Sequence, residues 1–275
     1  MSQRYAVIGN PVAHSKSPRI HAAFAAATRQ DMVYEHLHAE RGAFAATVDR
    51  FRCDGGAGLN VTLPFKLEAF AYADRHSERA AAAKAANTLK FERDGCYADN
   101  TDGAGLLRDL QHNLGLTLNG RRVLIMGAGG ATRGVLLPLL AAQPAQVTIV
   151  NRSADKAHQL AADFAPVRAV KACGYAELYG AQFDLVINAT SASLHRDLPP
   201  LPAGLFAADA AAYDMMYGAG DTQFMAYARR EGALRVHDGL GMLVEQAAES
   251  FYLWRGVRPA TAAVIALLRR DLNPV

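Results

Sequence analysis

The sequence of 275 residues predicts an α/β protein made of two α/β domains. Three observations predict this fold class. Strand-like and helix-like segments alternate along the chain, a glycine-rich turn at residues 127–130 separates an apolar strand from a helix, and the last two segments read as helices with no further strand. We expect a first domain at residues 1–102, a doubly wound second domain at 103–238, and C-terminal helices at 239–275 that return to the first domain.

The first domain begins with strand-like residues 5–9, and a helix follows in which Ser17 can act as the N-cap and Pro18 suits the first helical position. The expected elements then alternate in α/β order. They are a strand at 33–39, a helix at 43–51, a strand at 58–62, a helix at 66–74, and two short strands on either side of the turn at Asp94 and Gly95.

The second domain starts with a helix at 103–115 and continues as repeated strand and helix units. We expect strands at 121–127, 146–150, 167–170, 183–190, 210–215 and 234–238, with helices at 130–142, 153–164 and 221–232. This pattern is that of a doubly wound, Rossmann-like nucleotide-binding unit. Residues 239–256 and 258–272 form the two closing helices.

The composition is that of a globular protein, with 51% hydrophobic and 20% charged residues. The formal net charge of +3 comes from scattered basic residues, which argues against nucleic acid as the main partner and permits a small anionic ligand. Three cysteines, Cys53, Cys96 and Cys173, have neither an even count nor metal-ligand spacing, so we expect no disulfide framework and no metal site.

The N-terminal segment runs directly into a strand and lacks the apolar core of a signal peptide. No stretch of about 18 apolar residues occurs in the sequence. We therefore expect a cytoplasmic chain without a membrane span, a monomer or homodimer, whose ligand is a small molecule.

The turn "GAGG" places Gly127, Gly129 and Gly130 between the strand and the helix of the second domain. Glycine there permits a tight turn and lets backbone amides approach a pyrophosphate at the positive end of the helix. The match is imperfect, because a strict G-x-G-x-x-G motif needs glycine where the chain has Thr132. The alternative is a strand-to-helix turn without a ligand.

The segment "NRSADK" follows the next strand, about twenty residues beyond the glycine turn. An NAD-binding unit usually carries an acidic residue there, whereas this chain has Asn151 and Arg152, with Lys156 one turn into the helix. A guanidinium can hold a 2′-phosphate bidentately and stack on adenine. The pattern predicts NADP rather than NAD, and the alternative is a solvated, basic helix start.

Polar side chains gather at several strand ends of the first domain. Ser15 and Ser17, beside His14 and Lys16, could bind a carboxylate or a polyol, or form only a polar turn. Three further clusters suit a ligand with several hydroxyl groups, although each asparagine could instead form a turn or a cap. Their members are Asn60, Thr62, Asn87, Asp99, Asn100, Thr101 and Asp102.

The segment "NVTLPFK" ends in a lysine, Lys66, among apolar neighbours. A lysine paired with an aspartate can pass a proton to or from an alcohol as hydride arrives on or leaves the same carbon. We expect Pro64 to turn the chain into a helix whose first turn presents Lys66 to the ligand, with Asp102 as its partner. The alternatives are a solvated lysine at a helix start and an aspartate that only caps the helix after it.

Nine motifs in sequence order resemble the shikimate dehydrogenase family, which is NADP-dependent. They are "GNPVAHSKSP", "NVTLPFK", "AANTL", "DNTDG", "GAGGATRG", "NRSADKA", "NATSASL", "YDMMYG" and "DGLGMLVEQAA", and the resemblance that they carry extends over nearly the whole chain. The resemblance implies a substrate-binding and catalytic domain followed by an NADP-binding domain. It implies reversible reduction of 3-dehydroshikimate to shikimate with NADPH, on the route to chorismate and the aromatic amino acids, with no metal.

The resemblance also implies roles for individual residues, beginning with Lys66 and Asp102 as the acid–base pair. The implied substrate ligands are Ser15, Ser17, Asn60, Thr62, Lys66, Asn87, Asp102, Tyr217 and Gln246. The implied cofactor ligands are Gly127, Ala128, Gly129, Gly130, Ala131, Asn151, Arg152, Ser153, Lys156, Thr190, Met215, Gly239, Met242 and Glu78.

Four positions depart from the family pattern: Ala22 replaces an asparagine, and Lys84, Ala98 and Ser193 replace glycines. None of these changes removes a proposed ligand group, so they concern local backbone geometry. Two other functions stay open. One is a quinate/shikimate dehydrogenase, often NAD-dependent, and the other is a non-catalytic NADP- or metabolite-binding protein on the same scaffold.

Overall fold

The computed structural model describes residues 2–190, 192 and 197–273. These residues divide into two compact units. Unit 1 comprises residues 1–105 and 244–264, and unit 2 comprises residues 106–243 and 265–275. The expected boundaries after residues 102 and 238 stay predictions, but the return of residues 244–264 to the first unit agrees with the expected fold.

Unit 1 is built on a mixed sheet in which β3 pairs with β5 and β5 with β6 in antiparallel fashion, while the other neighbours are parallel. Among the described residues its strand order is β2 (Met32–His38), β1 (Gln3–Gly9), β3 (Gly56–Val61), β5 (Thr88–Glu92), β6 (Gly95–Asp99) and β4 (Arg75–His76). The two strands around the turn at Asp94 and Gly95 are thus β5 and β6, and β4 was not expected.

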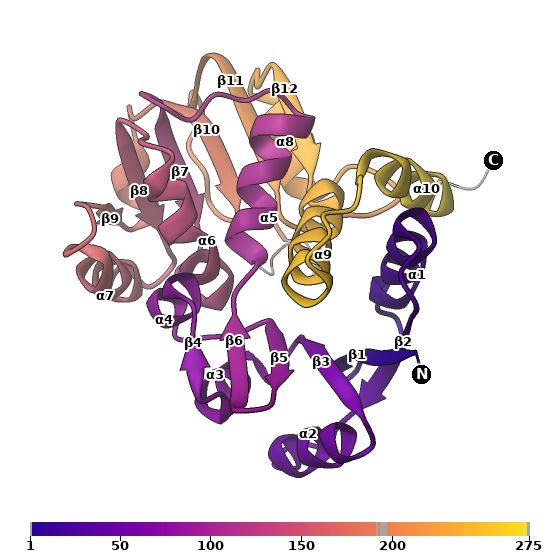
Figure 1. Ribbon diagram of the computed structural model, residues 1–275. Coiled ribbons are helices and arrows are strands. Elements are labelled where there is room, and N and C mark those ends of the chain that lie inside the picture. Colours follow the sequence, from indigo (N-terminus) through magenta and orange to yellow (C-terminus); the bar gives the residue numbers. More distant parts are fainter. Residues whose placement is uncertain (1, 191, 193–196, 274–275) are drawn as a thin grey trace. The chain divides into compact units, whose positions relative to one another are not determined.

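The helices of unit 1 are α1 (Ser17–Thr28), α2 (Phe44–Cys53), α3 (Lys66–Tyr72), α4 (Glu78–Ala83), most of α9 (Leu240–Arg255), and the start of α5 (Asp102–Arg108) and of α10 (Ala262–Leu272). In Figure 1, α1 and α2 lie on opposite sides of the strands β1 to β3.

Side-chain alternation along β1 explains this layering, because successive residues of a strand point to opposite faces. Ala6 and Ile8 belong to the buried apolar cluster that includes Phe44 of α2. Tyr5 points to the other face and stacks on Trp254 of α9, with 4.7 Å between ring centroids. Both faces of the sheet are therefore covered by helices.

Unit 2 is built on a parallel sheet whose order, from one edge, is β9 (Lys171–Cys173), β8 (Gln146–Val150), β7 (Arg122–Met126), β10 (Phe183–Asn188), β11 (Phe206–Asp214) and β12 (Arg235–Asp238). Numbered within the unit, this is the order 3-2-1-4-5-6 of a Rossmann sheet. The order reverses between β7 and β10, which is where such a sheet binds its ligand at the carboxyl ends of the strands. The prediction of a Rossmann-like domain is confirmed.

The remaining elements in the described part of unit 2 are α6 (Gly130–Ala141), α7 (Ala154–Phe164), a 3-10 turn η2 (Tyr175–Leu178), α8 (Gln223–Arg230), the start of α9, the ends of α5 and α10, and a π-helical turn η1 (Asp109–Asn113) that continues α5. Figure 1 shows these strands side by side with helices packed around them. One sheet face, with Leu124 and Met126, packs against Phe224 of α8. On the other face Val123 and Ile125 are fully buried as well, as expected for a parallel sheet.

Two local predictions were wrong. The expected strand at 167–170 is absent: Val167 ends a turn and is exposed, and residues 168–170 have no regular secondary structure. The partner strand of β8 is formed by residues 171–173 instead. Ser17 is not the N-cap of α1: the helix begins at Ser17, and Lys16 stands at the cap position. The Ser15 hydroxyl accepts the hydrogen bond from the Ser17 N–H at 3.3 Å, so the neighbouring serine satisfies this helix-start amide.

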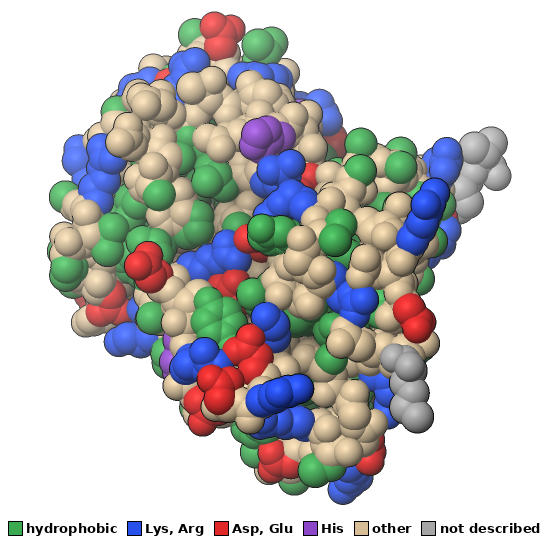
Figure 2. Space-filling model, in the orientation of Figure 1, with side chains coloured by type: hydrophobic (Ala, Val, Ile, Leu, Met, Phe, Trp, Pro, Cys, Tyr) green, Lys and Arg blue, Asp and Glu red, His purple; other side chains and the backbone are tan. Residues whose placement is uncertain are grey.

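Charge on the surface matches the scattered pattern of the sequence. Figure 2 shows Lys and Arg side chains dispersed among Asp and Glu side chains over the visible face, with no single basic stripe there. Several of the described arginines are held by carboxylates, for example Arg4 by Glu35 at 2.7 Å. This face therefore lacks the clustered positive charge of a nucleic-acid-binding surface.

Candidate active site

Lys66 is the first residue of α3, as expected from the sequence. The peptide bond between Leu63 and Pro64 is cis, and the Phe65 N–H donates to the Thr62 carbonyl at 3.0 Å. Phe65 is fully buried, whereas Leu63 is 72% exposed. The turn therefore anchors one apolar side chain in the core of unit 1 and leaves Lys66 at its edge, half-buried.

Lys66 donates a hydrogen bond from Nζ to Asp102 Oδ2 at 2.5 Å. The Lys66 side chain is 30% exposed and that of Asp102 is 14% exposed. Asp102 is the first residue of α5 rather than the residue before the helix. The geometry thus supports the predicted pair over the alternative in which Asp102 only caps the helix.

Asn87 holds the other oxygen of this carboxylate, because its Nδ2 donates to Asp102 Oδ1 at 2.8 Å. The same nitrogen lies 2.9 Å from Thr101 Oγ1 and 3.3 Å from Gln246 Oε1. The Asn87 amide oxygen accepts from the Thr101 N–H at 2.8 Å and from Thr88 Oγ1 at 2.9 Å. Asn87 is 3% exposed, so its rotamer is fixed and it fixes Asp102 in turn.

Gln246 reaches this cluster from α9, because α9 packs closely on the start of α5. A Cβ atom at Gly105 would lie 2.6 Å from the Gln246 backbone nitrogen, so no side chain fits at Gly105 without displacement. Unit 1 therefore brings together four predicted substrate ligands from four segments of the chain: Lys66, Asn87, Asp102 and Gln246.

Asn60 lies deeper than these ligands and is 6% exposed. Its Oδ1 accepts from Tyr34 Oη at 2.8 Å and from His21 Nε2 at 3.2 Å. Its Nδ2 lies within hydrogen-bond distance of the Asn87 carbonyl, Thr88 Oγ1 and Ser250 Oγ. These contacts occupy both polar atoms of the side chain. Direct substrate binding by Asn60 stays a prediction, and the structure shows it as a connector between α1, β3 and α9.

His21 is fully buried and stacks on Tyr34, with 4.2 Å between ring centroids and 5° between planes. Burial lowers the pKa of His21 to about 3, against the smaller opposing effect of the hydrogen bond with Asn60. Because the amide oxygen can only accept, the neutral imidazole carries its proton on Nε2. No local pattern in the sequence indicates that this histidine supports Asn60.

Ser15 and Ser17 stand next to each other as predicted, with Ser15 Oγ donating to Ser17 Oγ at 3.2 Å. Thr62 follows β3 directly and is half-buried. Asp99 was a further candidate ligand in the sequence, but its two carboxylate oxygens accept hydrogen bonds from Arg79 Nε at 2.7 Å and Nη2 at 2.6 Å. Burial opposes its charge, but the bonds from Arg79 outweigh it and hold the pKa of the Asp99 carboxyl below its ordinary value.

The glycine turn of unit 2 has the geometry expected of a phosphate-binding turn. Gly127 has φ +100°, a backbone conformation that favours glycine. A Cβ atom there would also press on Thr190 at 3.1 Å. Thr132, in place of the third motif glycine, is fully buried and donates from Oγ1 to the Gly127 carbonyl at 2.7 Å. The threonine therefore ties α6 to the turn.

The segment after β8 presents Arg152 at the surface of the same region. Arg152 is exposed, and within the described ranges no carboxylate forms an ion pair with it. Asn151 donates from Nδ2 to the Ser153 carbonyl at 2.9 Å, which shapes the turn into α7. The guanidinium is thus available to a ligand anion, as the sequence predicts.

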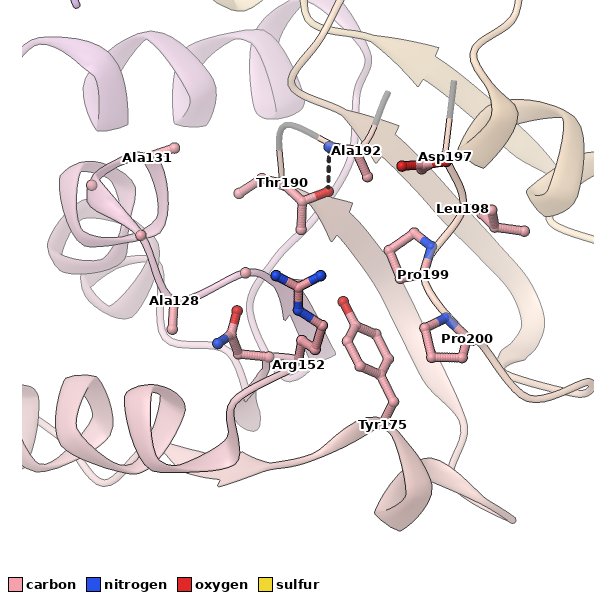
Figure 3. A pocket seen from close by; sticks show the side chains of 15 residues that line it. Ala128, Ala131, Arg152, Tyr175, Thr190, Ala192, Asp197, Leu198, Pro199 and Pro200 are labelled. Atoms are coloured by element: carbon pink, nitrogen blue, oxygen red, sulfur yellow. Dashed lines mark hydrogen bonds between the residues drawn. The ribbon is translucent and has the colours of Figure 1, made fainter. Parts of the chain in front are cut away.

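A pocket of about 670 Å³ lies at the carboxyl ends of β7, β8 and β10 (Figure 3). Its size suits a dinucleotide half or a drug-sized ligand. The predicted cofactor residues that line it are Gly127, Ala128, Gly129, Gly130, Ala131, Asn151, Arg152 and Thr190. Backbone amides, an arginine and the start of α6 are a donor set that fits the phosphates of NADP.

Several lining residues were not predicted from the sequence, namely Tyr175, Ala189, Ala192, Asp197, Leu198, Pro199 and Pro200. Tyr175 stands two residues beyond the end of β9, and Ala189 follows β10 directly. The rule that ligands lie at strand carboxyl ends could have located both. The proline segment carries no such signal, because a long connection brings it to the pocket.

Two buried polar residues position Thr190 and Met215, which were predicted as cofactor ligands; neither of the two was itself predicted from the sequence. Asn188 Oδ1 accepts from the N–H and from Oγ1 of Thr190, at 3.1 and 2.7 Å. Asp214 accepts from Asn188 Nδ2 at 3.2 Å, and the Met215 N–H donates to the Asn188 carbonyl at 2.9 Å. The ends of β10 and β11 are therefore locked together.

Other predicted ligands do not line this pocket and stay predictions. Ser153 and Lys156 lie at the start of α7, while Met215, Gly239 and Met242 lie beyond β11 and β12. Tyr217 belongs to unit 2 and Glu78 to unit 1, so the role of each toward the ligand of the other unit is untested. Burial is the main cause that raises the pKa of Tyr217.

One of the departures from the family pattern, Lys84, has a local explanation in the backbone. Lys84 directly follows α4 as its C-cap and has φ +51°, a left-handed conformation in which glycine is common. Ala98 is fully buried in β6, and Ala22 is exposed on α1. Ser193 lies outside the described residues.

In the part of the chain that the structure describes, no group of three or more His, Cys, Asp or Glu side chains is arranged to hold a metal ion. No helix within the same residues has the length and apolar character needed to cross a membrane.

Comparisons with known proteins agree with the motifs. Three family models match: the shikimate dehydrogenase substrate binding domain over residues 7–89, shikimate / quinate 5-dehydrogenase over 109–196, and the shikimate 5′-dehydrogenase C-terminal domain over 239–269. A shikimate dehydrogenase (NADP(+)) of Aromatoleum aromaticum is 63% identical over 273 residues, which cover 98% of each chain.

Solved structures show the same relationship. An Ael1 enzyme from Pseudomonas putida matches with a TM-score of 0.93 and 52% identity, covering 100% of this chain and 99% of that one. Shikimate 5-dehydrogenase from Thermus thermophilus, in complex with NADP(H) and shikimate, matches with a TM-score of 0.87 and 34% identity, covering 98% and 100%. The chain therefore belongs to the shikimate dehydrogenase family.

Proposed function

We propose that this chain is an NADP-dependent shikimate dehydrogenase, an oxidoreductase that reversibly reduces the 3-keto group of 3-dehydroshikimate to the alcohol of shikimate. The observation that supports it most is the pair formed by Lys66 and Asp102 at 2.5 Å. In this pair a half-buried ammonium group is held by a carboxylate, and Asn87 donates a hydrogen bond to the second oxygen of that carboxylate. A non-catalytic binding protein has no need of such an arrangement.

NADP is the cofactor that we propose for unit 2. The Gly127–Ala131 turn would hold the pyrophosphate, and Arg152 with Asn151 would hold the 2′-phosphate. When bound, NADPH supplies the hydride that adds to the carbonyl carbon. The pocket volume of about 670 Å³ and the exposed guanidinium of Arg152 support this assignment over a turn without a ligand.

Lys66 carries the proton chemistry. As hydride adds to the carbonyl carbon, negative charge develops on the carbonyl oxygen, and Lys66 Nζ gives that oxygen a proton. In the oxidation direction Lys66 accepts the proton from the alcohol. The geometry allows this because a lysine ammonium has three N–H donors, and Asp102 uses one at 2.5 Å. A positioned donor at the developing charge stabilises the transition state.

Asp102 and Asn87 orient rather than exchange protons. One oxygen of Asp102 holds Lys66 and the other accepts from Asn87, so neither side chain can rotate freely. Gln246 and Thr62 would bind ring hydroxyls, and Ser15 with Ser17 would bind the substrate carboxylate. Asn60 would support Asn87, whose carbonyl lies 3.2 Å from the Asn60 amide nitrogen, and direct contact of Asn60 with a ring hydroxyl stays a prediction.

The proposed role places the chain on the route to chorismate and the aromatic amino acids, with shikimate as a small-molecule partner. The described cysteines, Cys53, Cys96 and Cys173, are all free thiols, which suits a reducing cytoplasm. A monomer or homodimer stays the prediction for its assembly.

The test is steady-state NADPH formation by the purified chain supplied with shikimate and NADP+. We expect turnover in wild type and a fall of about 10²- to 10⁴-fold in kcat for Lys66→Met, which removes the proton carrier. Lys171→Met, at an exposed position of β9, is the matched control and should leave kcat unchanged. Cofactor binding without turnover in wild type would contradict the proposal.

The same assay separates shikimate from quinate, since the matching family model names both. Replacing each substrate and each cofactor in turn gives four values of kcat/KM. We expect the shikimate and NADP+ combination to be the highest. A higher value with NAD+ would contradict the assignment of Arg152.

A further inference from the structure

Among the described residues that line the cofactor pocket, Tyr175 is the one aromatic side chain, and the family motifs give it no role. It opens η2, two residues after β9 ends at Cys173. The Cys173 carbonyl accepts from the Asn151 N–H at 3.3 Å, which joins the end of β9 to the turn that carries Arg152. Strand pairing therefore sets Tyr175 beside Arg152.

Figure 3 shows the Tyr175 hydroxyl pointing into the pocket toward the Arg152 guanidinium, with Pro199 and Pro200 on the other side of the ring. The turn that carries it is fixed, because Glu177 Oε1 accepts from the Gly174 N–H at 2.7 Å and Leu178 is buried. The ring is half-buried. Tyr175 is thus held in one place with its polar end facing the ligand space.

The hydroxyl has no hydrogen-bond partner within the described part of the protein. Tyrosine hydroxyls in such half-buried positions usually find one. Burial raises the pKa of Tyr175 to about 12, and the nearby Arg152 charge opposes that rise. At neutral pH the group is therefore an O–H donor, without negative charge that would repel a phosphate.

We propose that Tyr175 is a specificity-determining residue for the cofactor, and that its hydroxyl donates a hydrogen bond to the 2′-phosphate held by Arg152. This inference rests on the proposed NADP site, and it adds a neutral hydrogen-bond donor, Tyr175, to the cationic donor, Arg152. A 2′-phosphate has several acceptor oxygens, so a guanidinium fork and a phenol hydroxyl can bind it together. NAD+ has only a ribose hydroxyl there, so Tyr175 favours NADP+.

The experiment compares wild type with Tyr175→Phe, which removes the hydroxyl and keeps the ring. Calorimetry measures Kd for NADP+, for 2′,5′-ADP and for NAD+. Loss of one hydrogen bond to a charged phosphate predicts a Kd about tenfold higher for NADP+ and for 2′,5′-ADP. The Kd for NAD+ should change less than about twofold, because a neutral partner loses less. The thermal midpoint of each variant confirms that it is folded.

Tyr179→Phe is the matched control, since Tyr179 directly follows η2, is 79% exposed and does not line the pocket. It should leave all three Kd values unchanged. Equal Kd values for wild type and Tyr175→Phe overturn the inference and leave the NADP site standing. An equal loss for NADP+ and NAD+ also overturns it, because the hydroxyl then does not read the phosphate. Failure of wild type to bind 2′,5′-ADP counts instead against the proposed cofactor.

Discussion

Replacing His21 by glutamine should change how the stability of unit 1 depends on pH. Glutamine can still donate from its amide to Asn60 Oδ1 but does not titrate. In the native protein burial keeps His21 neutral, with its pKa lowered from 6.5 to about 3. The unfolded chain binds a proton to this histidine below pH 6.5, so stability is lost as pH falls from about 6.5 toward 3.

The size of the effect follows from the two pKa values. Between pH 7 and pH 5 the unfolded state gains about 0.7 of a proton at His21, and the folded state gains almost none. Linkage then predicts a loss of about 2 kcal/mol in the free energy of unfolding over this interval. Tyr34, which stacks on His21, has a raised pKa and stays neutral throughout. Asp99 has a lowered pKa and contributes only below this window.

Trp254 gives a selective assay, because it is the single tryptophan of the chain and lies in unit 1, 5.4 Å from the His21 ring. Urea unfolding followed by its fluorescence at pH 7 and pH 5 reports the unit that contains His21. Loss of the imidazole stack should make His21→Gln less stable than wild type at pH 7. Between pH 7 and pH 5 it should then lose about 2 kcal/mol less than wild type does.

His158→Gln, at an exposed position of α7, serves as the control and should keep the wild-type pH dependence. The comparison of slopes removes the general destabilisation that any core substitution brings. Equal pH slopes for wild type and His21→Gln would refute the reasoning, since His21 would then titrate alike in the folded and unfolded states.

Three further predictions concern Asp102, Arg152 and Gly105. Asp102→Asn should lower kcat about 10- to 100-fold with a smaller change in KM, because Lys66 loses a charge-assisted hydrogen bond. An unchanged kcat in the assay of NADPH formation would show that Asp102 has no part in the mechanism. Arg152→Ala should raise KM for NADP+ roughly tenfold or more without a matching rise for NAD+, and an equal rise for both would show that Arg152 does not read the 2′-phosphate. Gly105→Ala would place a Cβ atom 2.6 Å from the Gln246 backbone nitrogen. Urea unfolding followed by Trp254 fluorescence should therefore show a free energy of unfolding lower by about 1–3 kcal/mol. A variant as stable as wild type would show that α9 can shift there freely.

Local sequence patterns predicted much of the fold and part of the site. The glycines at 127, 129 and 130 mark their turn because few other residues accept its backbone geometry. Arg152 was predictable because a parallel sheet places the end of its second strand beside that turn. Regular strand and helix alternation predicted a doubly wound domain, and the structure then showed its strand order, 3-2-1-4-5-6.

Residues that act through contacts between distant segments are not marked by any local sequence pattern. Asn188 and Asp214 lie 26 residues apart and meet only because β10 and β11 are neighbours. Asp99 resembled a ligand in sequence, yet Arg79 occupies it in the folded chain. In both cases the residue type was visible and its partner was not.

The sequence by itself determined the fold class, the order of most elements, the position of the phosphate-binding turn and the presence of Lys66 at a helix start. These depend on periodicity and on backbone preferences within a few residues. Only the tertiary structure decided that Lys66 meets Asp102, that Asn60 is enclosed by His21 and Tyr34, and that Tyr175 faces Arg152. The physical reason is that hydrogen bonding and burial depend on distances through space, which sequence separation does not give.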